Sequence, residues 1–241
     1  AQRLADTPGV ARTILGAARA ARGMPGADPR AMSHSWLFTG PPGSGRSLAA
    51  IDFAAALMCT DPEEPGCGRC EACRAVLETK QHTDLVLVDP QEVIIPVDTV
   101  REVIGRAASL PTVAPWRVVI FNNADRLNNN GANALLKTVE EPPARTVIIM
   151  CAPSDAPEDF SQTLRSRCRH LYIPSPSVES ITAQLVGEGA SDHDAHLAAL
   201  TSLRHVGRAR RLVNDPAVQK RRAVAINLAE EVFHGSQGFQ A

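Results

Sequence analysis

Residues 40–47 read GPPGSGRS and stand between an apolar run at 35–39 (SWLFT) and a helix-forming run at 48–58 (LAAIDFAAALM). Strand, glycine-rich turn and helix in this order are typical of a phosphate-binding loop, whose backbone N–H groups face the phosphates. The spacing G-x-x-x-x-G-x-[ST] is complete, whereas the alternative is a plain turn between strand and helix. We therefore expect a loop that can meet a nucleotide through Gly40, Gly43, Gly45, Arg46 and Ser47.

One position of this loop departs from the pattern. Arg46 stands where such loops carry a lysine that reaches the terminal phosphates. A guanidinium is a larger, planar fork and replaces a compact ammonium poorly inside a tight cradle. The sequence therefore allows ATP with Mg²⁺ at the loop but does not require it.

Composition excludes several classes of protein. With 44% hydrophobic and 21% charged residues, the 241-residue chain reads as globular, not disordered, and is long enough for two domains. A net charge of −1 gives no general field for nucleic acid, so DNA contact would need a local patch or partners. Neither a membrane-spanning run nor a secretory signal core stands out. We expect a cytoplasmic protein without membrane contact.

Four cysteines form the second informative pattern, with the spacing C-x7-C-x2-C-x2-C. Clustered thiols in a reducing compartment are typical of metal ligands and not of disulfides. Four thiolates complete a tetrahedral zinc site and leave no position open for substrate, which indicates a structural role. We expect Zn²⁺ to be bound by Cys59, Cys67, Cys70 and Cys73.

The strand expected at 118–121 is followed by two amides, Asn122 and Asn123. In a P-loop ATPase an Asp and a Glu here would hold Mg²⁺ and activate the attacking water. Asn122 offers Mg²⁺ only an uncharged oxygen, and Asn123 cannot accept a proton. We therefore expect the hydrolytic machinery to be absent, and we expect Asp125 to cap the following helix.

Strands alternate with helices up to residue 174, which predicts a parallel sheet covered by helices on both faces. Beyond the PSPS stretch at 174–177 the pattern is entirely helical, with segments at 178–186, 192–203, 206–213 and 217–233. We expect an α/β domain over residues 1–174, with the cysteine module at 59–73, and a small helical domain over residues 175–241.

Three arginines alternate in the segment LRSRCR before the last predicted strand, at Arg165, Arg167 and Arg169. Alternation along an extended chain would place them on one exposed side. A solvated basic strand edge is the alternative. The basic runs at 207–211 and 220–222 are expected to be solvated helix faces.

Four motifs occur in order: GPPGSGRS, the cysteine module, ANALLKTVEEPP at 132–143 and SRC at 166–168. Together they resemble the bacterial clamp-loader family of AAA+ proteins, and most of all its delta-prime branch, over about residues 10–241. The resemblance implies a RecA-like P-loop domain with the inserted zinc knuckle, a helical lid and a helical collar. We expect the collar to be absent from these 241 residues.

The resemblance also implies a role in DNA replication. The chain would be a clamp-loader subunit of DNA polymerase III that does not hydrolyse ATP and is not itself a polymerase. Arg167 would be an arginine finger serving ATP on a neighbouring subunit. Its partners would be the gamma/tau and delta subunits, with the sliding clamp and primed DNA reached through the assembly. The sensor position falls at Cys151 or Ala152, and the lid arginine at Arg208 or Arg210.

Two other functions stay open at this point. The chain could be an ATP-hydrolysing motor subunit of the gamma/tau kind, with Arg46 replacing lysine and another acid replacing Asn123. It could also be a zinc-stabilised interaction module that uses no nucleotide. Turnover that depends on Ser47 would indicate the first, whereas partner assembly that depends on the cysteines would indicate the second.

Overall fold

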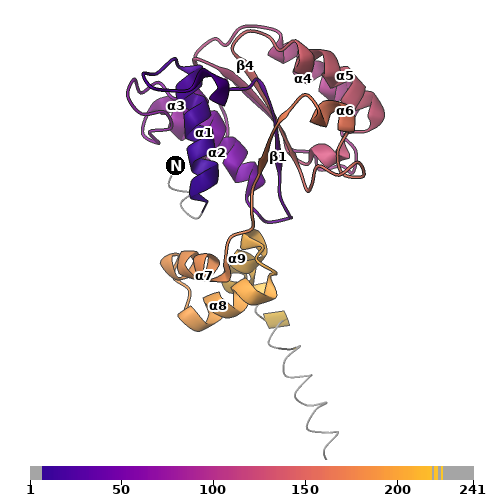
Figure 1. Cartoon of the computed structure of the whole chain (residues 1–241). Helices are drawn as coiled ribbons and strands as arrows, with labels where there is room; N and C mark the ends of the chain where they lie inside the picture. Colours follow the sequence, from indigo (N-terminus) through magenta and orange to yellow (C-terminus); the bar gives the residue numbers. More distant parts are fainter. Residues whose placement is uncertain (1–6, 219, 222–223, 225–241) are drawn as a thin grey trace, which may run out of the picture. The chain divides into compact units, whose positions relative to one another are not determined.

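The computed structural model describes residues 7–218, 220, 221 and 224. The chain divides into two compact units between Pro174 and Ser175. The first unit is an α/β layer structure and the second is built of helices (Figure 1). The predicted fold class, a parallel-sheet P-loop domain followed by helices, is confirmed.

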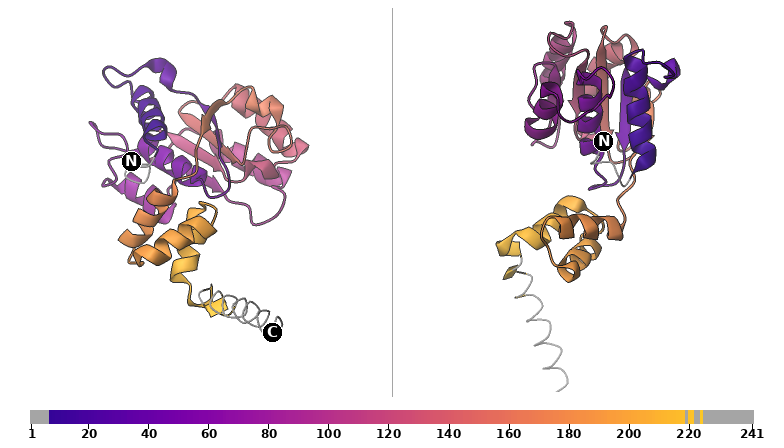
Figure 2. Two further views of the ribbon diagram at one scale, coloured as in Figure 1. Left: turned by 60° about the horizontal axis from the view of Figure 1, so that its bottom comes forward. Right: turned by 90° about the vertical axis from the view of Figure 1, so that its left-hand side faces the viewer.

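A five-stranded parallel sheet in the order β2-β3-β4-β1-β5 forms the centre of the first unit. The inner strands are fully buried because helices cover both faces of the sheet, which explains their continuous apolar runs (Figure 2). The edge strand β5 is more exposed and reads RHLY. The strands are β1 (Ser35–Thr39), β2 (Leu85–Val88), β3 (Arg117–Phe121), β4 (Thr146–Ala152) and β5 (Arg169–Tyr172).

Aromatic packing fixes one face of the sheet. Trp36 and Phe38 of β1 point to this face, and the Phe53 ring lies edge-on to Trp36 with centroids 5.1 Å apart. Such a pair stabilises the fold beyond the area it buries. The elements on this side are α1 (Pro8–Ala21), α2 (Arg46–Met58), α3 (Glu71–Arg74) and the π-helical turn η3 (Ala75–Thr79).

Leu37, which lies between these two aromatic residues in β1, points to the opposite face. Apolar residues of the covering helices, such as Val100 and Leu135, pack against it in a second core. This side holds α4 (Val97–Ala107), α5 (Asn129–Glu140) and α6 (Gln162–Arg165). The short 3-10 turns are η2 (Pro29–Ala31) and η4 (Ala124–Arg126).

The expected cap at Asp125 is wrong. Asp125 lies inside η4, and the N-cap of α5 is Asn128, whose Oδ1 accepts a hydrogen bond of 2.8 Å from the Gly131 N–H. Because the 3-10 turn η4 follows β3, α5 begins only at Asn129, too far along the chain for Asp125 to be its N-cap.

A buried ion pair ties the start of β2 to β3. Asp84 is fully buried, and its carboxylate accepts hydrogen bonds from the N–H groups of Thr112, Val113 and Ala114 and from Arg117 Nη2 at 3.0 Å. Burial raises the pKa of Asp84, but these donors outweigh burial and hold that pKa well below its usual range.

The second unit contains α7 (Val178–Gly187), α8 (Asp192–Thr201) and α9 (Val206–Asn214) around a small core that includes Ile181 and Leu185. Ser177 and Ser191 cap α7 and α8 through their side chains, as the capping preference of serine predicts. The fourth expected helix, 217–233, lies largely outside the described residues. Among the helices that are described, none is long and apolar enough to cross a membrane.

Candidate functional site

The predicted phosphate loop joins β1 to α2. Gly45 is the N-cap of α2 and has a φ of 91°, in the left-handed region that favours glycine. A Cβ atom on Gly40 would clash with the Ile173 carbonyl oxygen and with Ser44 Oγ. Gly43 also has a positive φ. These glycines allow the backbone to fold tightly around the start of α2, and the N–H groups at the start of a helix are suited to binding an anion.

Arg46 closes on this loop. Its Nη1 donates a hydrogen bond of 2.6 Å to the Gly40 carbonyl oxygen. Its Nε and Ser44 Oγ are buried and have no hydrogen-bond partner within the described part of the chain. Ser47 lies half-buried in the first turn of α2. The loop thus retains groups that suit a phosphate, but the guanidinium of Arg46 bonds to a carbonyl oxygen of the loop itself.

The two amides follow β3 at the carboxyl edge of the sheet, where the phosphate loop also lies. Asn122 is buried, and its Oδ1 has no hydrogen-bond partner among the described residues. Asn123 has a φ of 51° and is the N-cap of η4. Asparagine tolerates this left-handed conformation better than glutamate does. Asn123 therefore suits the local backbone conformation. Its amide, unlike a glutamate carboxylate, cannot act as a general base.

Both candidates for the sensor position, Cys151 and Ala152, lie inside β4 and are buried, because the strand extends to Ala152. Burial raises the pKa of Cys151 to about 12, although Arg46 acts in the opposite direction. This neutral thiol lies 3.9 Å from the Arg46 carbonyl oxygen.

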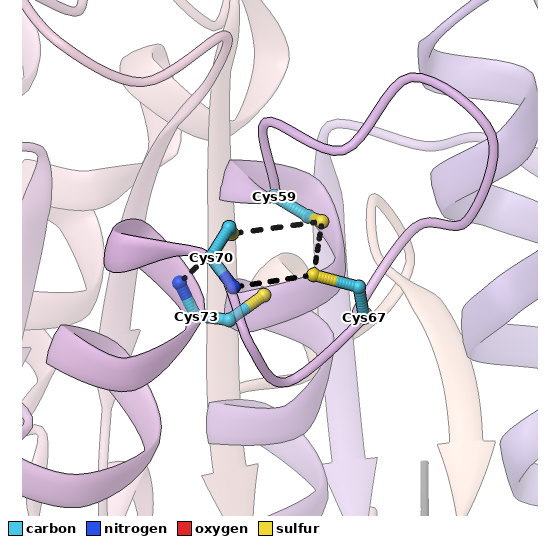
Figure 3. Close-up of side chains that lie close together, drawn as sticks. All are labelled: Cys59, Cys67, Cys70 and Cys73. Atoms are coloured by element: carbon cyan, nitrogen blue, oxygen red, sulfur yellow. Dashed lines mark hydrogen bonds between the residues drawn. The ribbon is translucent and has the colours of Figure 1, made fainter.

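The four predicted metal ligands come together, with all sulfur atoms within 4.8 Å of one another (Figure 3). Cys59 Sγ lies 3.6 Å from Cys67 Sγ and 3.9 Å from Cys70 Sγ. A tetrahedral ion with Zn–S bonds of about 2.3 Å separates its sulfur ligands by about 3.8 Å. The cluster therefore fits a tetrahedral metal ion.

Local backbone structure positions these ligands. Cys59 ends α2, Cys70 caps α3 and Cys73 lies within α3. The Cys70 N–H donates to Cys67 Sγ and the Cys73 N–H to Cys70 Sγ, each at 3.4 Å. Burial raises the pKa of Cys70, but hydrogen bonds from Thr60 and Cys73 outweigh it and lower that pKa to about 6. Such donors stabilise the thiolate that a metal requires.

Arg167 lies just after α6, with its side chain 37% exposed. Its Nε donates to Glu140 Oε1 at 2.6 Å, and its Nη1 donates to the Thr163 carbonyl oxygen at 2.8 Å and to Ser166 Oγ at 3.1 Å. The proposed finger is therefore exposed but held by residues of its own chain.

The prediction that three arginines share one side is wrong. Arg165 pairs with Asp155, whereas Arg169 donates to the carbonyl oxygens of Arg30 and Ala31 and lies over the Trp36 ring. The alternation fails because the first of the three ends a helix, and only Arg169 lies in a strand.

Sequence reasoning missed a polar chain at the carboxyl edge of the sheet. Thr39 Oγ1 lies 2.6 Å from His170 Nε2, and His170 Nδ1 lies 3.8 Å from Asp155 Oδ2. Asp155 in turn accepts hydrogen bonds from Arg165 Nε and Nη2, and this contact lowers its pKa. These polar contacts link Thr39, the residue before Gly40, to Arg165 at the end of α6. No local spacing signals it, because its members are far apart in sequence.

Within the helical unit, Arg210 donates to both carboxylate oxygens of Glu188. Arg208 is exposed, and it is the Arg208 backbone N–H that bonds to His205. The two candidates for the lid arginine thus differ, since one is paired within the unit and the other extends into solvent.

A family model described as "DNA polymerase III, delta subunit" matches residues 27–177, more than half of the chain. The DNA polymerase III subunit delta' of Pseudomonas aeruginosa is 35% identical over 173 residues, covering 69% of this chain and 52% of that protein. That of Escherichia coli is 34% identical over 170 residues, covering 69% and 50%. The chain spans about half the length of these relatives.

The gamma/tau subunit of Mycobacterium tuberculosis is 32% identical over 163 residues, covering 66% of this chain and 28% of that protein. Among solved structures, the Thermotoga maritima RuvB Holliday junction branch migration motor aligns with a TM-score of 0.51 at 17% identity, covering 85% of this chain and 59% of that one. This structural likeness supports the fold alone. On the family match and the named relatives, the chain belongs to the delta-prime clamp-loader family of DNA polymerase III.

Proposed function

We propose that this chain acts as a clamp-loader subunit of DNA polymerase III in replication and supplies Arg167 to ATP held by a neighbouring gamma- or tau-type subunit. The observation that carries the proposal is that the chain has a complete, exposed finger motif but an incomplete hydrolytic site. The delta subunit, the sliding clamp and primed DNA complete the proposed set of partners.

The chemistry of the finger is electrostatic. Negative charge on the oxygens around the transferred phosphoryl group is stabilised by a guanidinium, and a finger supplied in trans accelerates turnover by about 10³- to 10⁵-fold. Within this chain, Asn123 removes the general base, which costs about 10²- to 10⁴-fold. The chain would therefore activate ATP on its neighbour and leave any ATP of its own intact.

Nucleotide binding without cleavage is part of the proposal. ATP with Mg²⁺, when bound, supplies phosphates to the N–H groups at the start of α2 and a cation for the Ser47 hydroxyl. Arg46 would first have to release the Gly40 carbonyl oxygen, since its Nη1 now bonds to it. Once released, the guanidinium would be free to bind the phosphates, because arginine stays charged at any physiological pH.

We further propose that the cysteine cluster holds Zn²⁺ in a structural role. The metal, when bound, supplies four Zn–S bonds that join the end of α2 to α3. With four protein ligands the site has no open position for water or substrate.

The proposal is tested by ATP turnover of the reconstituted clamp loader with clamp and primed DNA. Arg167→Ala should reduce turnover strongly at the site that the finger serves, whereas the exposed control Arg12→Ala on α1 should not. Unchanged turnover with Arg167→Ala would remove the finger role.

The similarity to gamma/tau subunits favours a second candidate, an active ATPase. Turnover by the purified chain alone, lost in Ser47→Ala, would support this candidate. Turnover at background level would leave the finger-donating subunit.

A further inference from the structure

We propose that Glu140 is a latch for Arg167, which holds the guanidinium in a standby position until the phosphate of a neighbouring nucleotide displaces the carboxylate. The inference rests on the proposed function of Arg167. It concerns a residue of the TVEEPP segment, far from the SRC motif in sequence.

The hydrogen bonds of Arg167 carry the argument. Arginine grips a phosphate best through two neighbouring N–H groups of its planar fork. Glu140 Oε1 occupies Nε at 2.6 Å, and Thr163 and Ser166 occupy Nη1. A two-point contact can use either Nε with Nη2 or Nη1 with Nη2, and in each pair one nitrogen already has a partner in this chain. A two-point contact through Nε and Nη2 requires Glu140 to leave.

The exposure of the pair makes its opening feasible. The side chains of Arg167 and Glu140 are 37% and 46% exposed. Ion pairs in contact with water are weak and are screened by salt, unlike buried ones such as Asp84 with Arg117. A phosphate carrying more charge than one carboxylate can therefore take over the guanidinium, and Nη1 stays anchored on the Thr163 carbonyl oxygen.

The position of Glu140 argues against a purely structural role. Glu140 is the last residue of α5, where the helix dipole favours cations and disfavours a carboxylate. A residue selected only to stabilise this helix end would be basic. The neighbouring Glu141 has the same charge and is also exposed, but its carboxylate makes no ion pair within the described residues. Glu141 thus offers a matched control.

The test uses the reconstituted assembly with its ATPase partner, in the absence of clamp and DNA, and measures kcat and KM for ATP. Glu140→Gln removes the competing charge and should raise kcat about two- to fivefold, the range that an exposed ion pair can supply. KM should not change, because the finger acts in the transition state. Glu141→Gln should leave both constants unchanged. Added salt should reduce the difference in kcat between Glu140→Gln and the unmodified chain.

A kcat that is unchanged or lowered by Glu140→Gln would overturn the latch, and Glu140→Ala gives a second reading if the first variant folds poorly. Arg167→Ala separates the two proposals. If Arg167→Ala lowers turnover but Glu140→Gln does not raise it, only the latch fails. If Arg167→Ala has no effect, the finger role itself fails. In the double variant, the rise caused by Glu140→Gln should vanish.

Discussion

Arg46 Nη1 donates a hydrogen bond of 2.6 Å to the carbonyl oxygen of Gly40, the first residue of the phosphate loop. The cation that replaces lysine therefore bonds to the loop itself. The same arrangement recurs at Arg167 with Glu140 and at Arg210 with Glu188. Arg46, Arg167 and Arg210 are thus each held by an acceptor of this chain, whereas Arg208, the other candidate for the lid arginine, is exposed.

Arg46→Lys separates nucleotide binding from nucleotide cleavage. The shorter, compact ammonium should free the Gly40 carbonyl oxygen and tighten ATP binding. Turnover should stay at background, because Asn122 and Asn123 still supply neither a charged metal ligand nor a base. Binding of a fluorescent ATP analogue and phosphate release by the purified chain measure the two effects, with Ser47→Ala as the control. Turnover gained from Arg46→Lys alone would contradict our interpretation of the two amides.

Cys70→Ser tests the metal cluster. Loss of one thiolate should release zinc and lower the melting temperature by more than about 5 °C, because the bound ion would join the end of α2 to α3. Elemental analysis of the purified chain and thermal unfolding by circular dichroism give the two readouts. Cys168 lies outside the cluster, so the control variant Cys168→Ser should keep one zinc per chain. Equal zinc content in both variants would refute the site.

The sheet and its helices could be predicted because their signals are local. Strands buried on both faces require continuous apolar runs, and β1 has the predicted bounds Ser35–Thr39. The cysteine cluster could be predicted for a similar reason, since its ligands lie within one short segment and only the metal chemistry joins them.

The partners of the functional side chains could not be predicted. Glu140 meets Arg167 across 27 positions and Thr39 meets His170 across 131, so no periodicity reports either contact. The register of β1 against β5 sets the second, and the packing of α5 beside α6 sets the first. Asp125 failed as a cap for a smaller reason, because a 3-10 turn intervened before α5.

Asp84→Asn should be among the most damaging single changes in the α/β unit. It removes the charge that compensates buried Arg117 and turns one acceptor toward the backbone N–H groups as a donor. Breaking a buried pair from one side costs about 3–5 kcal/mol. Asp98→Asn, in an exposed pair with Arg101, should cost no more than about 1 kcal/mol. Urea unfolding of the two variants measures the difference, and equal midpoints would contradict the ranking.

The same carboxylate predicts how stability depends on pH. The pKa of Asp84 in the folded chain is lowered, so its contribution is present above the unfolded value of about 3.9 and is lost as pH falls toward the folded pKa. The difference in unfolding free energy between the unmodified chain and Asp84→Asn should therefore be constant from pH 7 to about 5. Below that it should shrink by up to about 1.4 kcal/mol per pH unit. Because all other groups are the same in both proteins, the difference isolates Asp84. A constant difference down to pH 3 would show that the pair does not lower the pKa of Asp84.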